Sequence, residues 1–180
     1  MRTVIFGGAN TLDNFIAGPD GGIDWIRHDR DAMAVLGKMW KTMDTIVMGR
    51  KTYEASLKMA GEGEAPPDHA FQGITTYVLS RTMTGEPKNG TLVREDGAEF
   101  VRRLKQQPGK DICVGSLSIA SQLSERGLID EYRFVVHPVV AGKGPRLFET
   151  VTPQGRLQLD FIGSEAFQSG VIALHYRKHS

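Results

Sequence analysis

The segment Ile46–Glu54 combines residue types that could bind a phosphate group. A short apolar stretch ends in Gly49, and Arg50, Lys51 and Thr52 follow where a helix is expected to begin. A helix N-terminus offers free backbone N–H groups and a partial positive charge, so backbone, dipole and side chains can bind a phosphate there together. The alternative is a glycine turn with solvated cations. Because cations at a helix start oppose the helix dipole, their placement favours an anionic partner.

A second junction of this kind is Tyr77–Arg81, where an apolar strand delivers Ser80 and Arg81 to its carboxyl end. In open α/β sheets ligands lie at that end of the strands, and the guanidinium fork can bond two oxygens of a terminal phosphate. A solvated surface pair is the alternative interpretation.

The third junction is Asp111–Ser118, in which an apolar strand runs through Gly115 into a helix that begins with hydroxyl residues. Glycine lets a ligand approach the backbone closely, and Ser116 could cap the helix, bond a pyrophosphate, or do both. Cys113 lies inside the apolar stretch and is predicted to be a core residue.

A glycine-rich loop, Thr11–Ile26, holds the remaining polar residues of interest. Asp20 precedes two glycines and is predicted to form a turn. Asp24 stands beside Trp25 and between isoleucines, where desolvation would let its carboxyl group hold a proton and serve as a proton donor. Capping of a helix that begins near Asp29 is the alternative role for Asp24.

These residues are positioned by a predicted alternation of strands and helices. Short apolar segments rich in β-branched residues predict strands, and apolar residues at helical spacing predict helices between them, which favours a largely parallel sheet. Later segments alternate without an intervening helix and predict an antiparallel end to the sheet. The predicted strands are Thr3–Gly7, Thr45–Met48, Thr75–Leu79, Thr91–Val93, Ile112–Val114, Tyr132–Val140, Leu157–Phe161 and Val171–Tyr176.

Helix boundaries can also be predicted. Asp96 and Glu99 have the spacing of a capping box, and a second helix is expected to open at Ser116 and to stop at Gly127. The stretch Gly61–Asp68 is predicted to be an exposed loop. The 180 residues are therefore interpreted as a single domain, 1–180.

Composition excludes several functions. The formal charge of +1 argues against a nucleic-acid or acidic-lipid binder. A single cysteine cannot form an internal disulfide, which favours a reducing, cytoplasmic location. Neither the dinucleotide-binding fingerprint nor a P-loop is present, and the histidines have no metal-binding spacing, so no metal is expected.

The ordered motifs resemble the dihydrofolate reductase-like superfamily. They are Thr11–Ala17, Gly18–Gly21, Ile23–Trp25, Met48–Glu54, Leu79–Arg81 and Val114–Ser116. Toward the C-terminus, Gly127–Tyr132 and His137–Phe148 are similar to the reductase domain of the bifunctional riboflavin-biosynthesis deaminase-reductase and its stand-alone relatives. Two positions depart from the pattern: Asn14, where relatives often have glycine, and Ser116, where dihydrofolate reductases have the second glycine of a pair.

The resemblance implies a three-layer α/β fold with a mixed, mostly parallel sheet, antiparallel C-terminal strands and flanking helices. It also implies NADPH laid across the strand ends, and usually a homodimer. Carried over, Gly49, Arg50, Lys51 and Thr52 would lie against the cofactor phosphates, Ser80 and Arg81 would hold the 2′-phosphate, Gly115, Ser116, Leu117 and Ser118 would meet the pyrophosphate, and Thr11, Leu12 and Asp13 would border the nicotinamide.

The function expected from these residues and the resemblance is NADPH-dependent reduction of a small heterocyclic or carbonyl- or imine-bearing substrate. Asp24 or Asp13 would donate a proton, and Trp25 and Lys143 are candidate substrate contacts, although Lys143 could be a solvated loop lysine. Three alternatives remain open: a dihydrofolate reductase, a non-catalytic NADPH-binding homodimer, and a module that binds another phosphorylated ligand.

Overall fold

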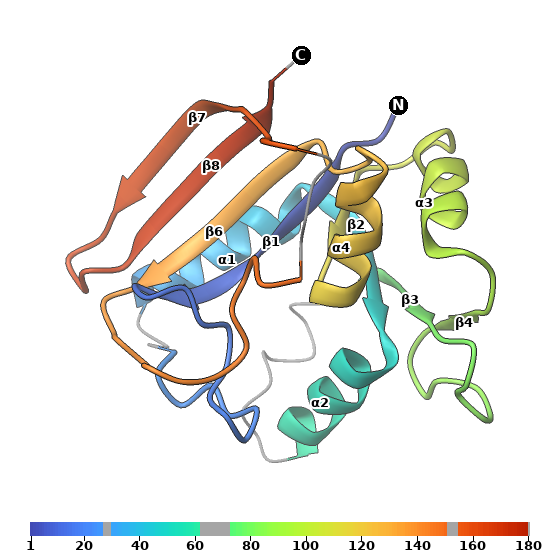
Figure 1. Ribbon diagram of the computed structural model, residues 1–180, viewed down its shortest axis with the longest axis horizontal. Coiled ribbons are helices and arrows are strands. Elements are labelled where there is room, and N and C mark those ends of the chain that lie inside the picture. The colour runs from blue at the N-terminus through green and yellow to red at the C-terminus, as the bar shows by residue number, and fades with distance from the viewer. Residues whose placement is uncertain (27–29, 62–72, 151–154, 180) are drawn as a thin grey trace.

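The computed structural model describes residues 1–26, 30–61, 73–150 and 155–179, and all eight of its strands belong to one sheet (Figure 1). The strands are β1 Val4–Thr11, β2 Met43–Gly49, β3 Thr75–Leu79, β4 Thr91–Val93, β5 Asp111–Val114, β6 Glu131–His137, β7 Leu159–Ala166 and β8 Ile172–Lys178. The helices are α1 Arg30–Lys41, α2 Arg50–Gly61, α3 Gly97–Lys105 and α4 Leu117–Glu125. The order of the sheet is β4-β3-β2-β5-β1-β6-β8-β7.

The sheet is parallel from β4 to β6 and antiparallel from β6 to β7. This division confirms the mixed, mostly parallel sheet expected from the sequence. The parallel half follows from the alternation of strands and helices, because each parallel connection needs a crossover of about a dozen residues. The antiparallel end follows from the tight turn between β7 and β8, where the N–H of Gly170 donates to the carbonyl of Phe167.

Two strands are several residues longer than expected from the sequence, and β6 ends at His137 and not at Val140. β1 continues past Gly7 to Thr11, because its register with β6 runs from Ile5 to Thr11 and pairs the last residue with His137. β7 begins at Leu159 and continues to Ala166, paired along β8. In both cases a neighbouring strand supports residues that are too polar or too small to show a strand pattern on their own.

The core has two faces, and helices cover both. On one face Phe6, Val47 and Val114 pack with residues of α3 and α4. On the other, Ile5, Ile46 and Cys113 pack with Met39 and Trp40 of α1. Figure 1 shows α4 in front of the sheet and α1 behind it. Each large apolar side chain buried in this way stabilises the folded state by roughly 1.5–3 kcal/mol. This core fixes the central strands and so positions the loops at their carboxyl ends.

An acidic side chain caps the first turn of α3. The carboxylate of Asp96 accepts hydrogen bonds from the N–H groups of Ala98 and Glu99 at the start of α3. The side chain of Glu99 pairs with Arg102 and Arg126, so the structure shows half of the expected capping box.

The Gly61–Asp68 loop lies, from residue 62 onward, outside the described residues. None of the helices in the described ranges is both long and apolar enough to cross a membrane.

Candidate active site

The three junctions singled out in the sequence lie side by side in the structure. Their strands β3, β2 and β5 are consecutive neighbours in the sheet, and β1 and β6 follow. Because all five are parallel, their carboxyl ends reach the same edge. That edge therefore carries the ends that lead to Ser80, Gly49, Gly115 and Thr11, in this order.

Gly49 contacts the start of α4 directly. A Cβ atom built on Gly49 would lie 3.2 Å from Oγ of Ser116 and 3.3 Å from Oγ of Ser118. The two serine hydroxyls are 3.1 Å apart. The absence of a side chain at Gly49 thus lets the starts of α2 and α4 lie close together, with two hydroxyl groups beside the glycine.

The N-termini of α2 and α4 lack the acidic side chains that usually complement a helix dipole. Neither helix has an acidic residue in its first turn, whereas α3 has Glu99 there and Asp96 at its N-cap. Ser116 occupies the N-cap of α4 but makes no side-chain cap hydrogen bond. The sequence left two roles open for Ser116, and the structure does not show the first of them, capping of α4 by its hydroxyl.

The cations at the start of α2 face solvent. Arg50 is exposed and lies 3.6 Å from Glu54, one turn further along the helix. Lys51 is exposed and Thr52 is half-buried. An exposed pair of this kind is worth only a few tenths of a kcal/mol, so Arg50 is available to an anion at the strand edge.

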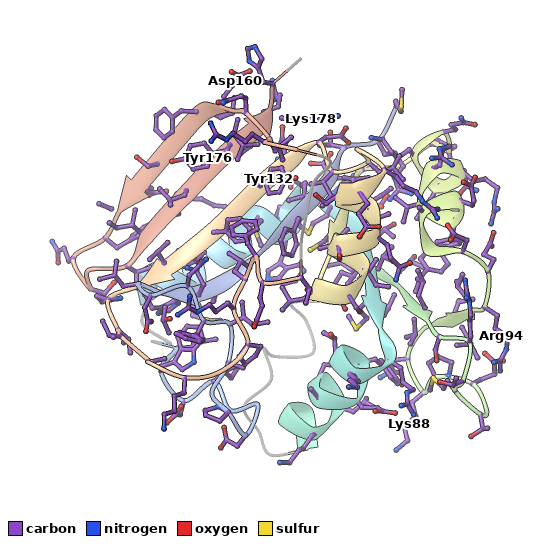
Figure 2. The ribbon with its side chains drawn as sticks, in the orientation of Figure 1. Lys88, Arg94, Tyr132, Asp160, Tyr176 and Lys178 are labelled. Carbon is purple, nitrogen blue, oxygen red and sulfur yellow. The ribbon has the colours of Figure 1, made fainter. Side chains whose placement is uncertain are left out.

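The loop that carries Ser80 and Arg81 is held at several points. Oγ of Ser80 accepts hydrogen bonds from the N–H groups of Thr82 and Met83. The hydroxyl of Tyr53 in α2 accepts the backbone N–H of Lys88 at 2.7 Å, and Arg94 donates to the carbonyl of Met83. Figure 2 shows Lys88 and Arg94 on the side of the molecule that β3 and β4 occupy. This bracing fixes the turn in which Arg81 is exposed to solvent.

Asp13 joins two loops at the same edge. Its carboxylate accepts hydrogen bonds from the hydroxyl of Thr11 and from the backbone N–H groups of Ala141 and Gly142. These bonds, the one from Thr11 above all, lower the pKa of Asp13 to about 2. The carboxyl group is therefore ionised at neutral pH. This geometry favours a positioning role for Asp13 over the proton donation expected from the sequence.

Asn14 has the backbone conformation that explains its departure from the family pattern. Its φ is 75°, and no other non-glycine residue in the described ranges has a positive φ. Glycine adopts this region without strain, and asparagine is one of the few other residues that tolerate it. The turn is closed by the N–H of Asn14, which donates to the carbonyl of Thr11. Asn14 thus keeps the geometry that a glycine would give.

Asp24 and Trp25 lie in a turn in which the N–H of Ile26 donates to the carbonyl of Ile23. Asp24 is exposed, so the desolvation expected from its isoleucine neighbours is not found. The ring of Trp25 packs edge-on against His137 at 5.4 Å between centroids, and its Nε1 is buried without a hydrogen-bond partner among the described residues. Trp25 therefore offers a buried N–H donor beside the end of β6.

The loop after β6 covers the loop after β1. The N–H of Leu12 donates to the carbonyl of Val139, and the N–H of Ile16 donates to the carbonyl of Pro145. A Cβ atom at Gly144 would fall 2.1 Å from the carbonyl oxygen of Ala17, so only glycine fits this contact. Lys143 is exposed in this loop, and Leu12 is exposed in the loop after β1.

Two polar residues at this edge were given no role by the sequence. Asn10 is buried, and its Oδ1 has no hydrogen-bond partner among the described residues. His137 is almost completely buried at the end of β6, beside Trp25. The sequence predicts that the first strand ends at Gly7, which would put Asn10 in a loop. Asn10 lies at the site because β1 continues to Thr11.

Comparison with known proteins agrees with this architecture. The RibD C-terminal domain family matches residues 2–173. YyaP, an uncharacterized protein of Bacillus subtilis strain 168, is 33% identical over 182 residues, which cover 98% of this chain and 95% of YyaP.

Solved structures show the same fold. A putative riboflavin biosynthesis protein from Shewanella sp. PV-4 superposes with a TM-score of 0.79 at 22% identity, over 99% of this chain and all of that one. Dihydrofolate reductase from Enterococcus faecalis, solved with NADP(H), gives a TM-score of 0.66 at 15% identity, over 99% and 97% of the two chains. The fold is dihydrofolate reductase-like, and by sequence the chain belongs to the RibD C-terminal domain family.

Proposed function

We propose that the chain is an NADPH-dependent reductase of a small heterocyclic or carbonyl- or imine-bearing molecule. Its family includes the reductase domain of a riboflavin-biosynthesis enzyme, which supports a reductase-type activity. The observation that carries the proposal is the close approach of two helix starts at Gly49, both without acidic residues in the first turn and with the hydroxyls of Ser116 and Ser118 beside the glycine.

The residues present fit a pyrophosphate. Two helix N-termini that meet at one place supply backbone N–H groups and partial positive charge. The hydroxyl of Ser116 makes no capping hydrogen bond, and a Cβ at Gly49 would crowd the hydroxyls of Ser116 and Ser118. Gly115 is exposed, with only a side-chain methyl of Ile46 close to where its Cβ would be. Gly49–Thr52 and Gly115–Ser118 would hold the phosphates.

Arg81 supports a preference for NADPH over NADH. It is exposed beyond the end of β3, the strand next to β2, on a loop braced by Tyr53. A guanidinium can bond two oxygens of a terminal phosphate, which NADPH carries on its ribose and NADH lacks. Ser80 would add a hydroxyl donor, since its oxygen already accepts from the backbone of its own turn.

The substrate would lie beyond the end of β1, between Thr11–Asp13 and Trp25. Bound NADPH would supply a hydride. The buried N–H of Trp25 would donate to a substrate acceptor, and Asp13 would hold the loop after β6 over the site. Because Asp13 has a positioning role, the exposed Asp24 is the remaining candidate proton donor, and Lys143 is the candidate contact for an anionic substrate group.

The first test is the thermal shift of the protein with NADPH and with NADH. A ligand at about a hundred times its dissociation constant stabilises the folded state by roughly 2.7 kcal/mol, so micromolar binding is measurable. NADPH should give the larger shift, and Arg81→Ala should reduce the preference by about tenfold or more in affinity. Arg102→Ala, an exposed arginine on α3, is the matched control. If neither nucleotide shifts the melting curve, the proposal fails.

The second test is oxidation of NADPH with a panel of folates, pterins, flavin precursors and quinones. Turnover with dihydrofolate would make the chain a dihydrofolate reductase. Tight NADPH binding without turnover of any candidate favours the non-catalytic module instead. Asp24→Asn should abolish most turnover and leave NADPH affinity unchanged; unaltered turnover removes Asp24 from the mechanism.

We also propose that the protein is a cytoplasmic homodimer. Phe161 and Ile172 of the antiparallel strands are exposed, and Phe161 packs edge-on against Tyr176. Figure 2 shows Tyr176 and Tyr132 close together on β8 and β6. Phe161→Ser should shift sedimentation toward the monomer, and a wild-type protein that sediments as a monomer at all concentrations would end this proposal.

A further inference from the structure

A cleft separate from the candidate active site lies between α1 and the antiparallel strands. Its volume is about 450 Å³. It is lined by the last turns of α1, the middle of β6, and parts of β7 and β8, and it shares no residue with the strand ends described above. We propose that this cleft binds a second small molecule, one with an apolar body and a single anionic group such as a carboxylate.

The size and the walls of the cleft fit a small molecule. Binding pockets for such ligands have volumes of about 300–1,000 Å³ and mostly apolar walls with a few polar groups. Here Met39 comes from α1, Val135 from β6 and Ala173 from β8. By strand alternation Ala173 lies on the same face of the sheet as His175, the face that α1 covers. The apolar part of a ligand would pack between this face and the helix.

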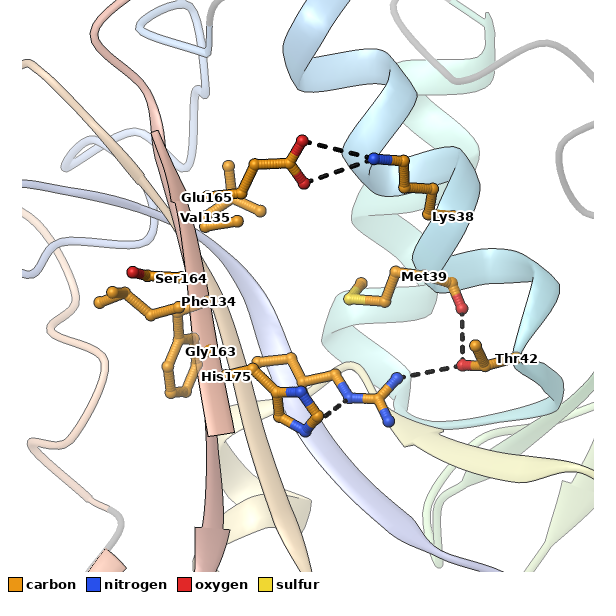
Figure 3. A pocket seen from close by; sticks show the side chains of 12 residues that line it. Lys38, Met39, Thr42, Phe134, Val135, Gly163, Ser164, Glu165 and His175 are labelled. Atoms are coloured by element: carbon orange, nitrogen blue, oxygen red, sulfur yellow. Dashed lines mark hydrogen bonds and ion pairs between the residues drawn. The ribbon is translucent and has the colours of Figure 1, made fainter. Parts of the chain in front are cut away.

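Polar groups stand at two opposite ends of the cleft. Figure 3 shows Lys38 and Glu165 at one end, His175 and Thr42 at the other, and Met39 between them. Nζ of Lys38 lies 3.4 Å from Glu165, and both side chains are more than half exposed. Arg133 donates from Nη1 to the hydroxyl of Thr42 at 3.1 Å. An elongated ligand could therefore meet a polar group at each end.

Arg133 is held in place by a buried carboxylate. Nε and Nη2 of Arg133 both donate to Oε2 of Glu131, whose side chain is only 6% exposed. Because the guanidinium is fixed before any ligand arrives, little side-chain entropy is lost when it binds one. Its Nη1 group carries a second N–H besides the one directed to Thr42.

The charges around the cleft favour an anion. Lys38 and Arg133 are cations, and Glu165 is the one carboxylate among the lining residues. Glu131, behind the wall, already takes five hydrogen bonds from Arg133, Arg177 and His175, so it has no oxygen left for a ligand cation. Asp111 lies 3.7 Å from Nη2 of Arg133, the same nitrogen that donates to Glu131. The remaining N–H groups of Lys38 and Arg133 would donate hydrogen bonds to a carboxylate or a similar anion.

The test uses two fluorescent probes that differ only in charge. Anilinonaphthalene sulfonate has an aromatic body and one anionic group, and phenylnaphthylamine has the same body without it. The sulfonate should bind the wild-type chain saturably, with one probe per chain and more tightly than the neutral probe. Saturating NADPH should leave this binding unchanged, because the cleft is separate from the strand ends.

Variants locate the probe. Ala173→Phe fills the cleft and should weaken both probes by about tenfold or more. Lys38→Gln should weaken only the sulfonate, by about threefold. Lys41→Gln, on the same helix but outside the cleft, should change neither. Because Ala173 is half-buried and its variant could misfold, Thr42→Trp provides a second blocking change at an exposed position.

Three results would overturn the proposal. One is sulfonate binding that both blocking variants leave intact, and another is displacement of the probe by NADPH. The third is probe affinity that falls as protein concentration rises, because a second copy of the chain would then occupy the cleft. Failure of NADPH binding alone would contradict the proposed reductase function and leave the cleft proposal standing.

Discussion

Asp13 and Gly142 are joined by a hydrogen bond of 2.7 Å between the carboxylate and the backbone N–H, although 129 positions separate them. Ala141 and Thr11 donate to the same carboxylate. The loop after β1 and the loop after β6 are therefore linked through one carboxylate, and the ionised form of Asp13 is the one that accepts all three hydrogen bonds.

The first prediction concerns pH. Folding lowers the pKa of Asp13 from 3.8 to about 2, so its contribution to stability is fully present above pH 3.8 and is lost as the pH falls toward 2. Asp13→Asn should lower the melting temperature at neutral pH, and the difference from wild type should shrink across this acid window. Melting curves of both proteins over a pH series test this. A difference that stays constant to the lowest pH would contradict the assignment.

The second prediction concerns Asn14 and its positive φ. A residue with a branched or simple Cβ in this region costs about 1–2 kcal/mol, whereas glycine costs nothing sterically. Asn14→Ala should therefore lower the free energy of unfolding by about 1 kcal/mol. Asn14→Gly should stay within about 0.5 kcal/mol of wild type. Urea denaturation measures both, with Asn89→Ala at an exposed position as the control.

The third prediction concerns the close approach at Gly49. Gly49→Ala places a methyl group 3.2 Å from Oγ of Ser116, so the start of α4, which would hold the pyrophosphate, must shift. NADPH affinity should fall by about tenfold or more while the protein remains folded. Gly37→Ala in α1 is the matched control, because its new Cβ meets nothing within 4 Å. That variant should keep NADPH affinity and gain up to about 1 kcal/mol of stability. Equal affinity in both variants would remove Gly49 from the cofactor site.

The fourth prediction concerns the buried carboxylate of Glu131. Arg133, Arg177 and His175 all bond to it, and burial opposes ionisation while these bonds hold the pKa at about 2. Glu131→Gln should cost about 2–3 kcal/mol, because it leaves two guanidiniums without their partner. Glu165→Gln, in an exposed pair, should cost under about 0.5 kcal/mol. Similar losses in the two variants, measured by denaturant unfolding, would contradict this account.

The sequence was sufficient for the arrangement of elements and for the strand edge, but not for the contacts across it. The β-branched residues of β2, β3 and β5 made those strands predictable, and the glycine and hydroxyl residues after them marked the edge. The exposure of Asp24 could not be predicted, because apolar neighbours in the sequence do not determine whether a loop carboxylate is buried in the fold. The hydrogen bonds around Glu131 could not be predicted either, because His175 and Arg177 lie 44 and 46 positions away in the sequence.

The single cysteine of this chain has a practical consequence for labelling experiments. Cys113 is in β5, paired with Ile5 on one side and Ile46 on the other, and burial raises its pKa to about 12. Since the thiolate is the reactive form, the folded protein should not react with maleimide or iodoacetamide at neutral pH. A cysteine introduced on the surface would then be the one site that takes a dye or spin label. The rate at which a thiol reagent slowly modifies Cys113 would then measure how fast the central strands separate.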